Sequence, residues 1–453
     1  MTLAAADATG LAPLPAWSVL PFAALLLAIA VLPLIHRTER WWESNRNKFI
    51  VSMACGAAAL AAIAGTHGAG AAGGAVGHAA AEFVPFIVLL FSLYVISGGI
   101  LITGDLRGAP ATNTAVLALG AVAANALGTT GASMLLIRPI LRANAGRRHR
   151  AHVVVFFIFL VSNVGGLLLP IGDPPLFLGY LRGVPFGWTL GLHKEWMAAT
   201  ASLLVLFYFL DAHFARKEGA SAEPAAPVES TTRPEIRVAG ANNVLWLAGV
   251  VLAAAVLVPG RQLGGWTVPD GAREAAMILC AIASLRTTPP AIREQNRFAY
   301  GPIVEVAALF SGLFLAMQPA LEILVERGGQ LGLASRAGFF WATGGLSSFL
   351  DNAPTYLVFA DVARAITPQD AAAAAGATVP FSGGVVDAGL LAAVSCGAVF
   401  MGANTYIGNG PNLMVAAIAR EDGVRMPTFF GYMLWSGAVL LPLFAALTWV
   451  FFR

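Results

Sequence analysis

Residues 162–179 read SNVGGLLLPIGDPPLFLG, and this stretch decides the fold because it places an acid inside a long apolar run. Asp173 lies between Gly172 and the pair Pro174-Pro175. Proline removes a backbone donor and clashes with the preceding turn, so a helix should break here. An uncompensated acid at the bilayer centre costs at least about 2.5 kcal/mol. The stretch therefore predicts a broken helix in which a cation or a proton neutralises Asp173.

The composition indicates an integral membrane protein. Of the 453 residues, 58% are hydrophobic and 11% are charged, whereas soluble chains carry roughly 25% charged residues. Apolar stretches of about 20 residues recur, as helical spans require, and the alternation typical of an outer-membrane barrel is absent. The net charge is +3, and no basic tract is long enough to bind nucleic acid. The three cysteines are isolated in apolar runs, which argues against disulfides or a metal site.

The apolar runs and basic clusters predict ten full spans and two re-entrant hairpins. The first run, 17–35, has no basic residues before it, so we expect a retained span with its N-terminus outside. The positive-inside rule places four basic clusters in the cytoplasm; these clusters lie at 142–150, 216–237, 286–297 and 420–425. Simple alternation of spans does not satisfy that rule. Hairpins at 112–141 and 336–362, opening to opposite sides, do satisfy it.

Two hairpins of opposite orientation are what an inverted repeat produces. We therefore expect an all-α polytopic membrane protein made of a first repeat, 1–213, and a second, inverted repeat, 242–453. Each repeat has a hairpin followed by a broken helix, at 151–181 and at 385–418. Residues 214–241 are polar and rich in Ala, Pro and Glu, which predicts a flexible cytoplasmic linker.

A Gly/Ala-rich stretch at 67–78, HGAGAAGGAVGH, is expected to form an extracellular loop. Its two histidines, His67 and His78, offer a metal site as the alternative. Two further residues leave alternatives open. Glu305, inside a span, relays protons or pairs with an Arg in a static scaffold. Asp211, near a span end, is expected to be interfacial.

The two broken helices carry the same motif. IGDPPLFLG starts at Ile171, and IGNGPNLMV starts at Ile407. Non-helical backbone at membrane depth survives only where it is buried in protein or lines a wet cavity. Its free carbonyls and helix ends are typical of transporter ion sites. Small polar residues precede both motifs, namely Asn163 in the first half and Asn404 and Thr405 in the second.

The hairpin tips add a second matched pair of breaks. The first tip holds Thr129 and Thr130, and the second holds Ser347, Asp351 and Asn352. Each half therefore has one acid, Asp173 or Asp351, among neutral oxygens. A carboxylate that holds either a sodium ion or a proton is the minimal device for exchange. The alternative interpretation, that both acids cap helix N-termini, is compatible with ion binding.

Four motifs in order make the chain recognisable: GTTGASMLLIRP, SNVGGLLLPIGDPPLFLG, LSSFLDNAPT and MGANTYIGNGPN. From about residue 80 to 451 the chain resembles the ion transporter superfamily. The resemblance is nearest to NhaD-type sodium/proton antiporters, and more distant to ArsB-type arsenite permeases and citrate or dicarboxylate carriers. The first tip lacks the Ser-Asn-Thr of carboxylate carriers and the Asn-Asp of arsenite permeases, which favours the antiporter branch.

The resemblance implies a homodimer in a bacterial inner membrane, a scaffold, and a transport domain that works by an elevator motion. It also implies which residues surround the ions: Thr129, Thr130, Asn163, Asp351, Asn352, Asn404 and Asn409. We expect Na⁺, or Li⁺, and H⁺ as the transported ions and no other cofactor.

Three functions compete at this point. The first is sodium/proton exchange at Asp173 and Asp351, with the nearby hydroxyls and amides as neutral ligands. The second is cation-coupled transport of an organic anion, or efflux of arsenite. The third is an intramembrane aspartyl protease, but no Tyr-Asp lies in a span, so an enzyme is not expected.

Overall fold

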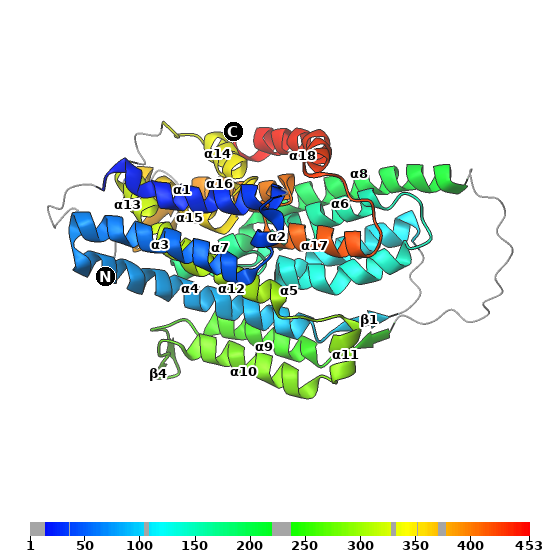
Figure 1. Ribbon diagram of the computed structural model, residues 1–453, viewed down its shortest axis with the longest axis horizontal. Coiled ribbons are helices and arrows are strands. Elements are labelled where there is room, and N and C mark those ends of the chain that lie inside the picture. Colours follow the sequence, from blue (N-terminus) through cyan, green and yellow to red (C-terminus); the bar gives the residue numbers. More distant parts are fainter. Residues whose placement is uncertain are drawn as a thin grey trace.

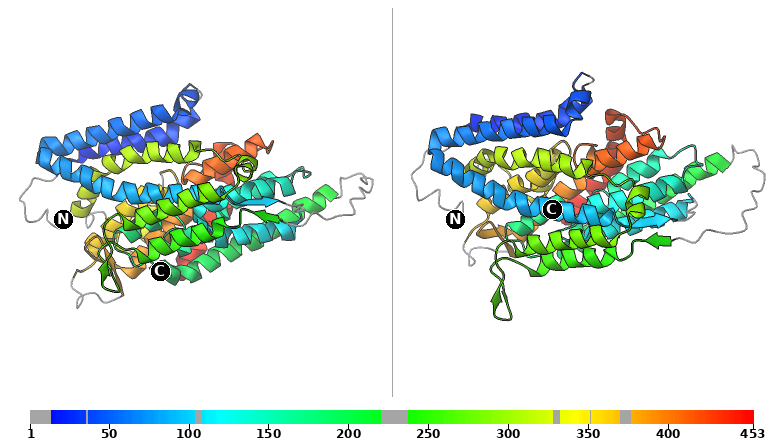
Figure 2. Two further views of the ribbon diagram at one scale, coloured as in Figure 1. Left: turned by 90° about the horizontal axis from the view of Figure 1, so that it is seen from below. Right: turned by 60° about the horizontal axis from the view of Figure 1, so that its bottom comes forward.

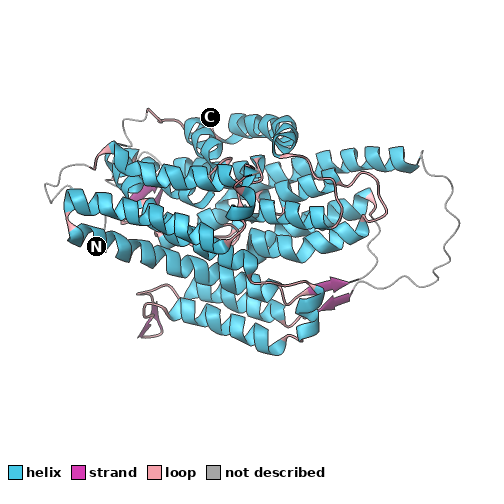
Figure 3. Cartoon of the chain, viewed as in Figure 1, coloured by secondary structure: helices cyan, strands magenta, loops and turns pink. Residues whose placement is uncertain are grey.

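The computed structural model describes residues 14–35, 37–103, 108–219, 237–327, 332–350, 352–369 and 377–453. Helices dominate these residues, and the strands form only short two-stranded ribbons at helix ends (Figure 3). Six of the described helices are long and apolar enough to cross a membrane, and shorter apolar helices accompany them. Most long helices run roughly along the long axis of the molecule (Figure 1). The expected all-α polytopic membrane architecture is confirmed.

The first half contains these main helices: α1 (Leu20–Val31), α3 (Asn45–His67), α4 (Ala69–Ser97), α5 (Pro110–Ala143), α6 (Ala151–Leu160), α7 (Pro174–Leu181) and α8 (His193–Gly219). The second half contains α9 (Asn243–Val256), α10 (Ala272–Thr287), α12 (Gly301–Ala316), α13 (Gln318–Arg327), α14 (Arg336–Ser347), α15 (Asn352–Ile366), α16 (Ala388–Met401), α17 (Gly410–Glu421) and α18 (Phe429–Phe451). The strands pair as β1 (Leu101–Thr103) with β2 (Arg237–Ala239), β3 (Gln262–Leu263) with β4 (Trp266–Thr267), and β5 (Thr378–Phe381) with β6 (Gly384–Asp387).

The α5 segment folds back on itself. A straight helix would separate Asn113 from Asn144 by about 46 Å, yet their side chains exchange hydrogen bonds of 2.8 and 2.9 Å. The reversal occurs at Gly128, whose φ of 73° and ψ of 154° lie outside the helical region. Only glycine adopts such a backbone conformation readily. The break thus lies one residue before the expected tip at Thr129.

The second hairpin consists of α14 and α15, which pack against each other and against α16. Its turn includes residues 348–350. Asp351, which the sequence assigns to this tip, lies outside the described residues. The two hairpins therefore differ in how they reverse direction, one at a glycine and one through a short turn.

Both predicted broken helices are interrupted. In the first half α6 is followed by a 3₁₀ turn, Val164–Leu168, and the helix resumes as α7 at Pro174. In the second half α16 is followed by the turn Gly402–Asn404, and α17 starts at Gly410. The two halves thus present hairpin, broken helix and closing helix in the same order. The repeat boundaries at 1–213 and 242–453 stay a prediction.

The helices fall into two groups by their packing. The outer group, α1, α3, α4, α9, α10 and α12, packs mainly within itself, and both views of Figure 2 place α1 and α3 at the periphery. The core group contains α5, α6, α7 and α14 to α17. Within the outer group, α3 and α12 approach closely, and Ser52 Oγ donates to the carbonyl of Ala308 at 2.6 Å. Lys48 and Glu305 form an ion pair of 2.5 Å along the same contact.

Several of the predicted cytoplasmic basic clusters meet at one end of the molecule, near β1 in Figure 1. Arg142 donates to the carbonyl of Ile102 at 2.8 Å, and Arg293 donates to that of Val95 at 2.6 Å. Arg150 contacts the carbonyl of Gly423 at 3.3 Å. These contacts join α5 to β1, α11 (Pro290–Gln295) to α4, and the residue before α6 to the turn after α17, which agrees with one shared membrane face for the clusters.

The expected loop at 67–78 is wrong, because α3 runs to His67 and α4 begins at Ala69. Alanines of this stretch, Ala71, Ala72 and Ala75, pack against a small buried cluster that includes Ile63. Tertiary packing of this kind overrides the low helix propensity of glycine. Among the described residues, no three His, Cys, Asp or Glu side chains gather as a metal site.

The expected linker at 214–241 begins and ends in regular structure. Residues 214–219 continue α8, and Arg237–Ala239 forms β2 beside β1. Residues 220–236 lie outside the described part of the chain.

Candidate functional site

Asp173 lies at the centre of the core group and is 1% exposed. Its Oδ1 accepts a hydrogen bond from Thr129 Oγ1 at 2.8 Å and one from Asn409 Nδ2 at 3.2 Å. Its Oδ2 accepts one from Asn352 Nδ2 at 2.6 Å. These donors come from the first hairpin, the second hairpin and the second broken helix. The carboxylate is therefore the point where both halves of the chain meet.

The side chain of Asp173 does not cap the helix that follows it. Asp173 occupies the residue before α7, in an extended conformation, but it makes no side-chain capping hydrogen bond. The three donors named above are uncharged groups, and an ionised Asp173 among them is a buried negative charge. Burial of such a charge is costly unless a counter-charge or a proton accompanies it.

The backbone around Asp173 explains the glycines in the motif. A Cβ at Gly172 would collide with the carbonyl of Gly166, and one at Gly408 would lie 2.6 Å from the carbonyl of Gly402. Each half thus folds its break tightly across six residues. The Thr129 amide also donates to the Gly172 carbonyl at 2.8 Å, which fixes the first hairpin tip on the break.

A second layer of amides joins the two broken helices. Asn163 Nδ2 donates to Asn412 Oδ1 at 2.8 Å, and Asn409 Nδ2 also lies 3.3 Å from Asn163 Oδ1. Asn412 Nδ2 in turn donates to the carbonyls of Gly402 and Thr405 at 2.8 and 2.9 Å. All these carbonyls belong to residues at the second break, where the helical hydrogen bonds are missing.

The second half contributes buried oxygens that lack partners. The Oδ1 atoms of Asn352 and Asn404 are both buried, and neither has a hydrogen-bond partner among the described residues. Asn404 Nδ2 donates to Ser348 Oγ at 2.9 Å, and Thr405 Oγ1 bonds the Ser348 carbonyl. Buried acceptors without donors cost free energy, and such oxygens are suited to accept from a water molecule or to bind a cation.

The remaining predicted site residues lie at different distances from this centre. Ser347 is buried and donates to the carbonyl of Ala398 at 2.7 Å, which ties the second hairpin to α16. Thr130 is half-buried. Glu305 lies in the outer group, paired with Lys48 rather than with an Arg. Asp351 is outside the described residues.

Sequence reasoning missed Asn412 and Ser162. Ser162 Oγ lies 2.8 Å from Ser133 Oγ, and the Ser162 carbonyl accepts from Asn409 Nδ2 at 3.0 Å. Both residues stand in the motifs quoted from the sequence. Asn412 follows Asn409 by three positions and therefore lies on the same face of α17. That spacing is the signal that could have found Asn412.

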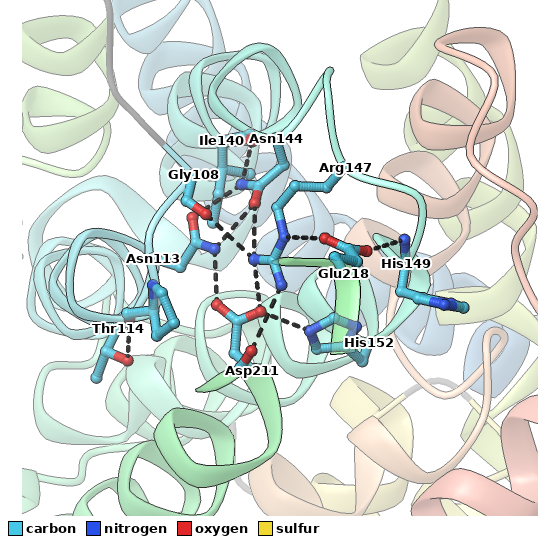
Figure 4. Close-up of polar contacts among 11 residues, drawn as sticks. Gly108, Asn113, Thr114, Ile140, Asn144, Arg147, His149, His152, Asp211 and Glu218 are labelled. Carbon is cyan, nitrogen blue, oxygen red and sulfur yellow. Dashed lines mark hydrogen bonds and ion pairs between the residues drawn. The ribbon is translucent and has the colours of Figure 1, made fainter. Parts of the chain in front are cut away.

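A separate buried network closes the base of the first hairpin (Figure 4). Asp211, near the end of α8, is fully buried inside the protein. It pairs with Arg147 at 2.6 Å and His152 at 2.8 Å, and accepts from Asn113 Nδ2 at 2.8 Å. Arg147 also reaches Glu218 at 3.3 Å. The network joins both ends of α5 to α6 and α8, so it stabilises the hairpin that carries Thr129.

The arrangement brings together groups of the kind that bind small cations. It has one buried carboxylate and several hydroxyl and amide oxygens at two helix breaks, where two matched halves meet. Transporter sites are typically built in this way. None of the curated proteins matches the chain. A family model described as "Putative citrate transport" matches residues 11–452. Because the match spans nearly the whole sequence, the chain belongs to this family of membrane transporters.

Proposed function

We propose that the protein exchanges Na⁺, or Li⁺, for H⁺ at Asp173. The single observation that carries the proposal is the burial of this carboxylate among uncharged donors drawn from both halves. A sodium ion and a proton each neutralise the same group, so they compete for it. Asp351, at the second hairpin tip, is proposed as the second exchanging acid.

The amide contacts offer a mechanism by which Asp173 changes from a hydrogen-bonded carboxylate to one that binds a cation. With Asp173 ionised and no cation bound, Asn352 and Asn409 donate their N–H groups to it. Rotation of the Asn352 amide would direct its Oδ1, which has no hydrogen-bond partner among the described residues, toward a bound cation instead. Such a rotation exchanges a donor for an acceptor without moving the backbone, which suits rapid exchange of the two ions.

The transport step is proposed to be a movement of the core group against the outer group. Asp173 and the residues bonded to it all belong to the core group, so the site would travel as one body. This is the elevator motion that the family resemblance implies, and it requires that contacts between α4 and the core group change.

Cation-coupled transport of an organic anion is the second candidate, and the family description favours it. In that case Na⁺ or H⁺ at Asp173 would be the coupling ion, and a citrate-like anion would bind beside it. Helix N-termini and amide donors at the two breaks supply the positive potential that an anion needs. Arsenite efflux is the remaining alternative within the superfamily.

The test is ion flux in proteoliposomes of the purified chain with a trapped pH dye. A sodium pulse with no organic anion present should release protons from the lumen in the antiporter. If the sodium pulse alone moves no protons, and labelled citrate or a dicarboxylate accumulates in response to a sodium or a proton gradient, the second candidate holds instead. A lack of both sodium-driven proton movement and anion accumulation would refute both.

A further inference from the structure

A buried charge cluster lies between the outer group and the core group, away from Asp173. Glu82 of α4 pairs with Arg182, the residue that ends α7, and the two side chains are 7% and 6% exposed. Arg182 also lies 3.6 Å from Asp361 of α15, which is fully buried. Arg364, one turn further along α15, lies 3.6 Å from the same carboxylate. The cluster thus holds two acids and two arginines.

The position of this cluster relates it to the transport site. Arg182 follows Asp173 by nine residues along α7, and Asp361 follows Asn352 by nine residues along α15. Nine residues of helix span about 13 Å, and α7 packs against α15. The cluster therefore lies one short helix length from the site, on the side away from the basic clusters.

Several charged atoms of the cluster lack hydrogen-bond partners among the described residues, which is not expected of a permanent structural ion pair. Glu82 Oε2, Arg182 Nη2 and both oxygens of Asp361 are buried without a hydrogen bond to any described residue. Both contacts to Asp361 are 3.6 Å long, beyond hydrogen-bond range. Arg182 Nε does donate a hydrogen bond to Glu82 Oε1, but buried ion pairs stabilise poorly because desolvation offsets the Coulomb attraction, so the Glu82–Arg182 pair can separate when its charges regain water.

The two-stranded ribbon of β5 and β6 covers this charge cluster at the surface. Arg182 Nη1 donates to Ser382 Oγ at 3.1 Å, and Ser382 N bonds the Arg182 carbonyl at 2.6 Å. Ser382 lies in the turn between β5 and β6. His78, 39% exposed, lies 3.7 Å from Glu82 and forms the edge of the cluster that faces outward. The charges are thus close to solvent at one side.

We propose that Glu82, Arg182 and Asp361 form a latch. The latch holds the C-terminal ends of α7 and α15 against α4 and keeps the transport site closed on that side. Glu82 belongs to the outer group, whereas Arg182 and Asp361 belong to the core group. Any relative movement of the two groups must break the Glu82–Arg182 pair, and breaking it admits water along α7 and α15. The proposal rests on the transporter function but not on the identity of the transported ion.

The test measures access of a reagent beneath the latch. A reporter cysteine replaces Val358, which is 8% exposed and lies one turn before Asp361 on the same face of α15. The background carries alanine at the three native cysteines. Protein in proteoliposomes is treated with a membrane-impermeant maleimide from the side where α15 ends. We expect slow labelling in this parent and at least fivefold faster labelling after Glu82→Gln.

The matched control is Lys48→Gln, which removes an ion pair inside the outer group and should leave labelling unchanged. Equal labelling rates in Glu82→Gln and Lys48→Gln would overturn the latch. Should Glu82→Gln fail to give a monodisperse protein, Glu82→Asp keeps the charge and shortens the reach, and about a twofold rise is expected. An unchanged rate there overturns the latch too. Labelling needs no substrate, so its outcome is independent of the sodium and citrate fluxes.

Discussion

Thr129 is bonded both to Asp173 and to the residue before it, since the Thr129 hydroxyl donates to the Asp173 carboxylate and the Thr129 amide donates to the carbonyl of Gly172. The tip of one hairpin is thereby fixed to the break in the helix that follows it. The hydroxyl contact offers Asp173 a donor in one state and a neutral oxygen ligand for a cation in the other.

Replacing Thr129 by valine keeps the shape of the side chain and removes the hydroxyl. The hydroxyl is proposed as an oxygen ligand of the bound cation, and a contact to a charged group contributes roughly 1.5–3 kcal/mol, so we expect the sodium concentration for half-maximal flux to rise about tenfold or more. Thr130→Val is the matched neighbour. If the two variants behave alike, the assignment of Thr129 as the ion-facing threonine is wrong.

Asp173→Asn should abolish sodium-dependent proton flux while the protein remains folded, because the amide keeps the shape and removes the exchangeable charge. Flux in proteoliposomes and thermal stability by fluorescence are measured together. The control is Asp387→Asn, which only weakens the cap of α16, where Asp387 Oδ1 accepts from Leu390 N at 2.9 Å. Normal exchange by Asp173→Asn would remove the basis of the carboxylate mechanism.

Gly172→Ala should impair both transport and stability, because the added methyl group would collide with the Gly166 carbonyl. Gly345→Ala is the control, since nothing lies within 4 Å of a Cβ at that helical position. That substitution should stabilise by roughly 0.5–1 kcal/mol. Thermal unfolding of both variants in detergent checks the difference, and a harmless Gly172→Ala would mean that the break is not tightly packed.

Asp211→Asn should destabilise the protein strongly, because it leaves Arg147 and His152 without their shared anion. Loss of one partner of a buried ion pair costs about 3–5 kcal/mol. Glu218→Gln, at the more exposed edge of the same network, should cost about 1 kcal/mol or less. Comparable unfolding temperatures for the two variants would show that the buried network does not stabilise the first hairpin.

Glu305→Gln separates the two roles that the sequence left open. Glu305 is 42% exposed and paired with Lys48 in the outer group, so we expect nearly unchanged flux at every pH. The loss of stability should be at most about 1 kcal/mol. A proton relay would instead show a flux that falls several-fold, and that result would restore the first alternative.

The sequence predicts the helix breaks because their causes are local. Gly172, Asp173 and Pro174 are neighbours, and their effects on the backbone do not depend on the rest of the fold. The same reasoning placed Thr129 in the half-site of Asp173, but it assigned Asn409 to the half-site of Asp351, so the contact between Asn409 and Asp173 was not predicted. These predictions needed only short-range physics and one comparison within the chain.

The buried charges away from the site could not be predicted in the same way. Asp211 lies near the end of a span in sequence, and its burial depends on Arg147 from a loop 64 residues earlier. Glu82 pairs with Arg182, which lies 100 residues later in the sequence. The helical stretch 69–78 likewise depends on a tertiary contact. Such pairings follow from packing, and sequence spacing alone does not reveal them.

Asp173 and Asn409 hold matching places, with φ and ψ of −145° and 144° in one and −153° and 141° in the other. Their side chains meet at 3.2 Å, a separation at which two carboxylates would repel and two amides would carry no charge. Because the two backbones match and the two side chains meet, one side chain has to be a carboxylate and the other an amide. The two side chains differ by one oxygen exchanged for one nitrogen, so only the Asp173 side of this contact can carry a negative charge.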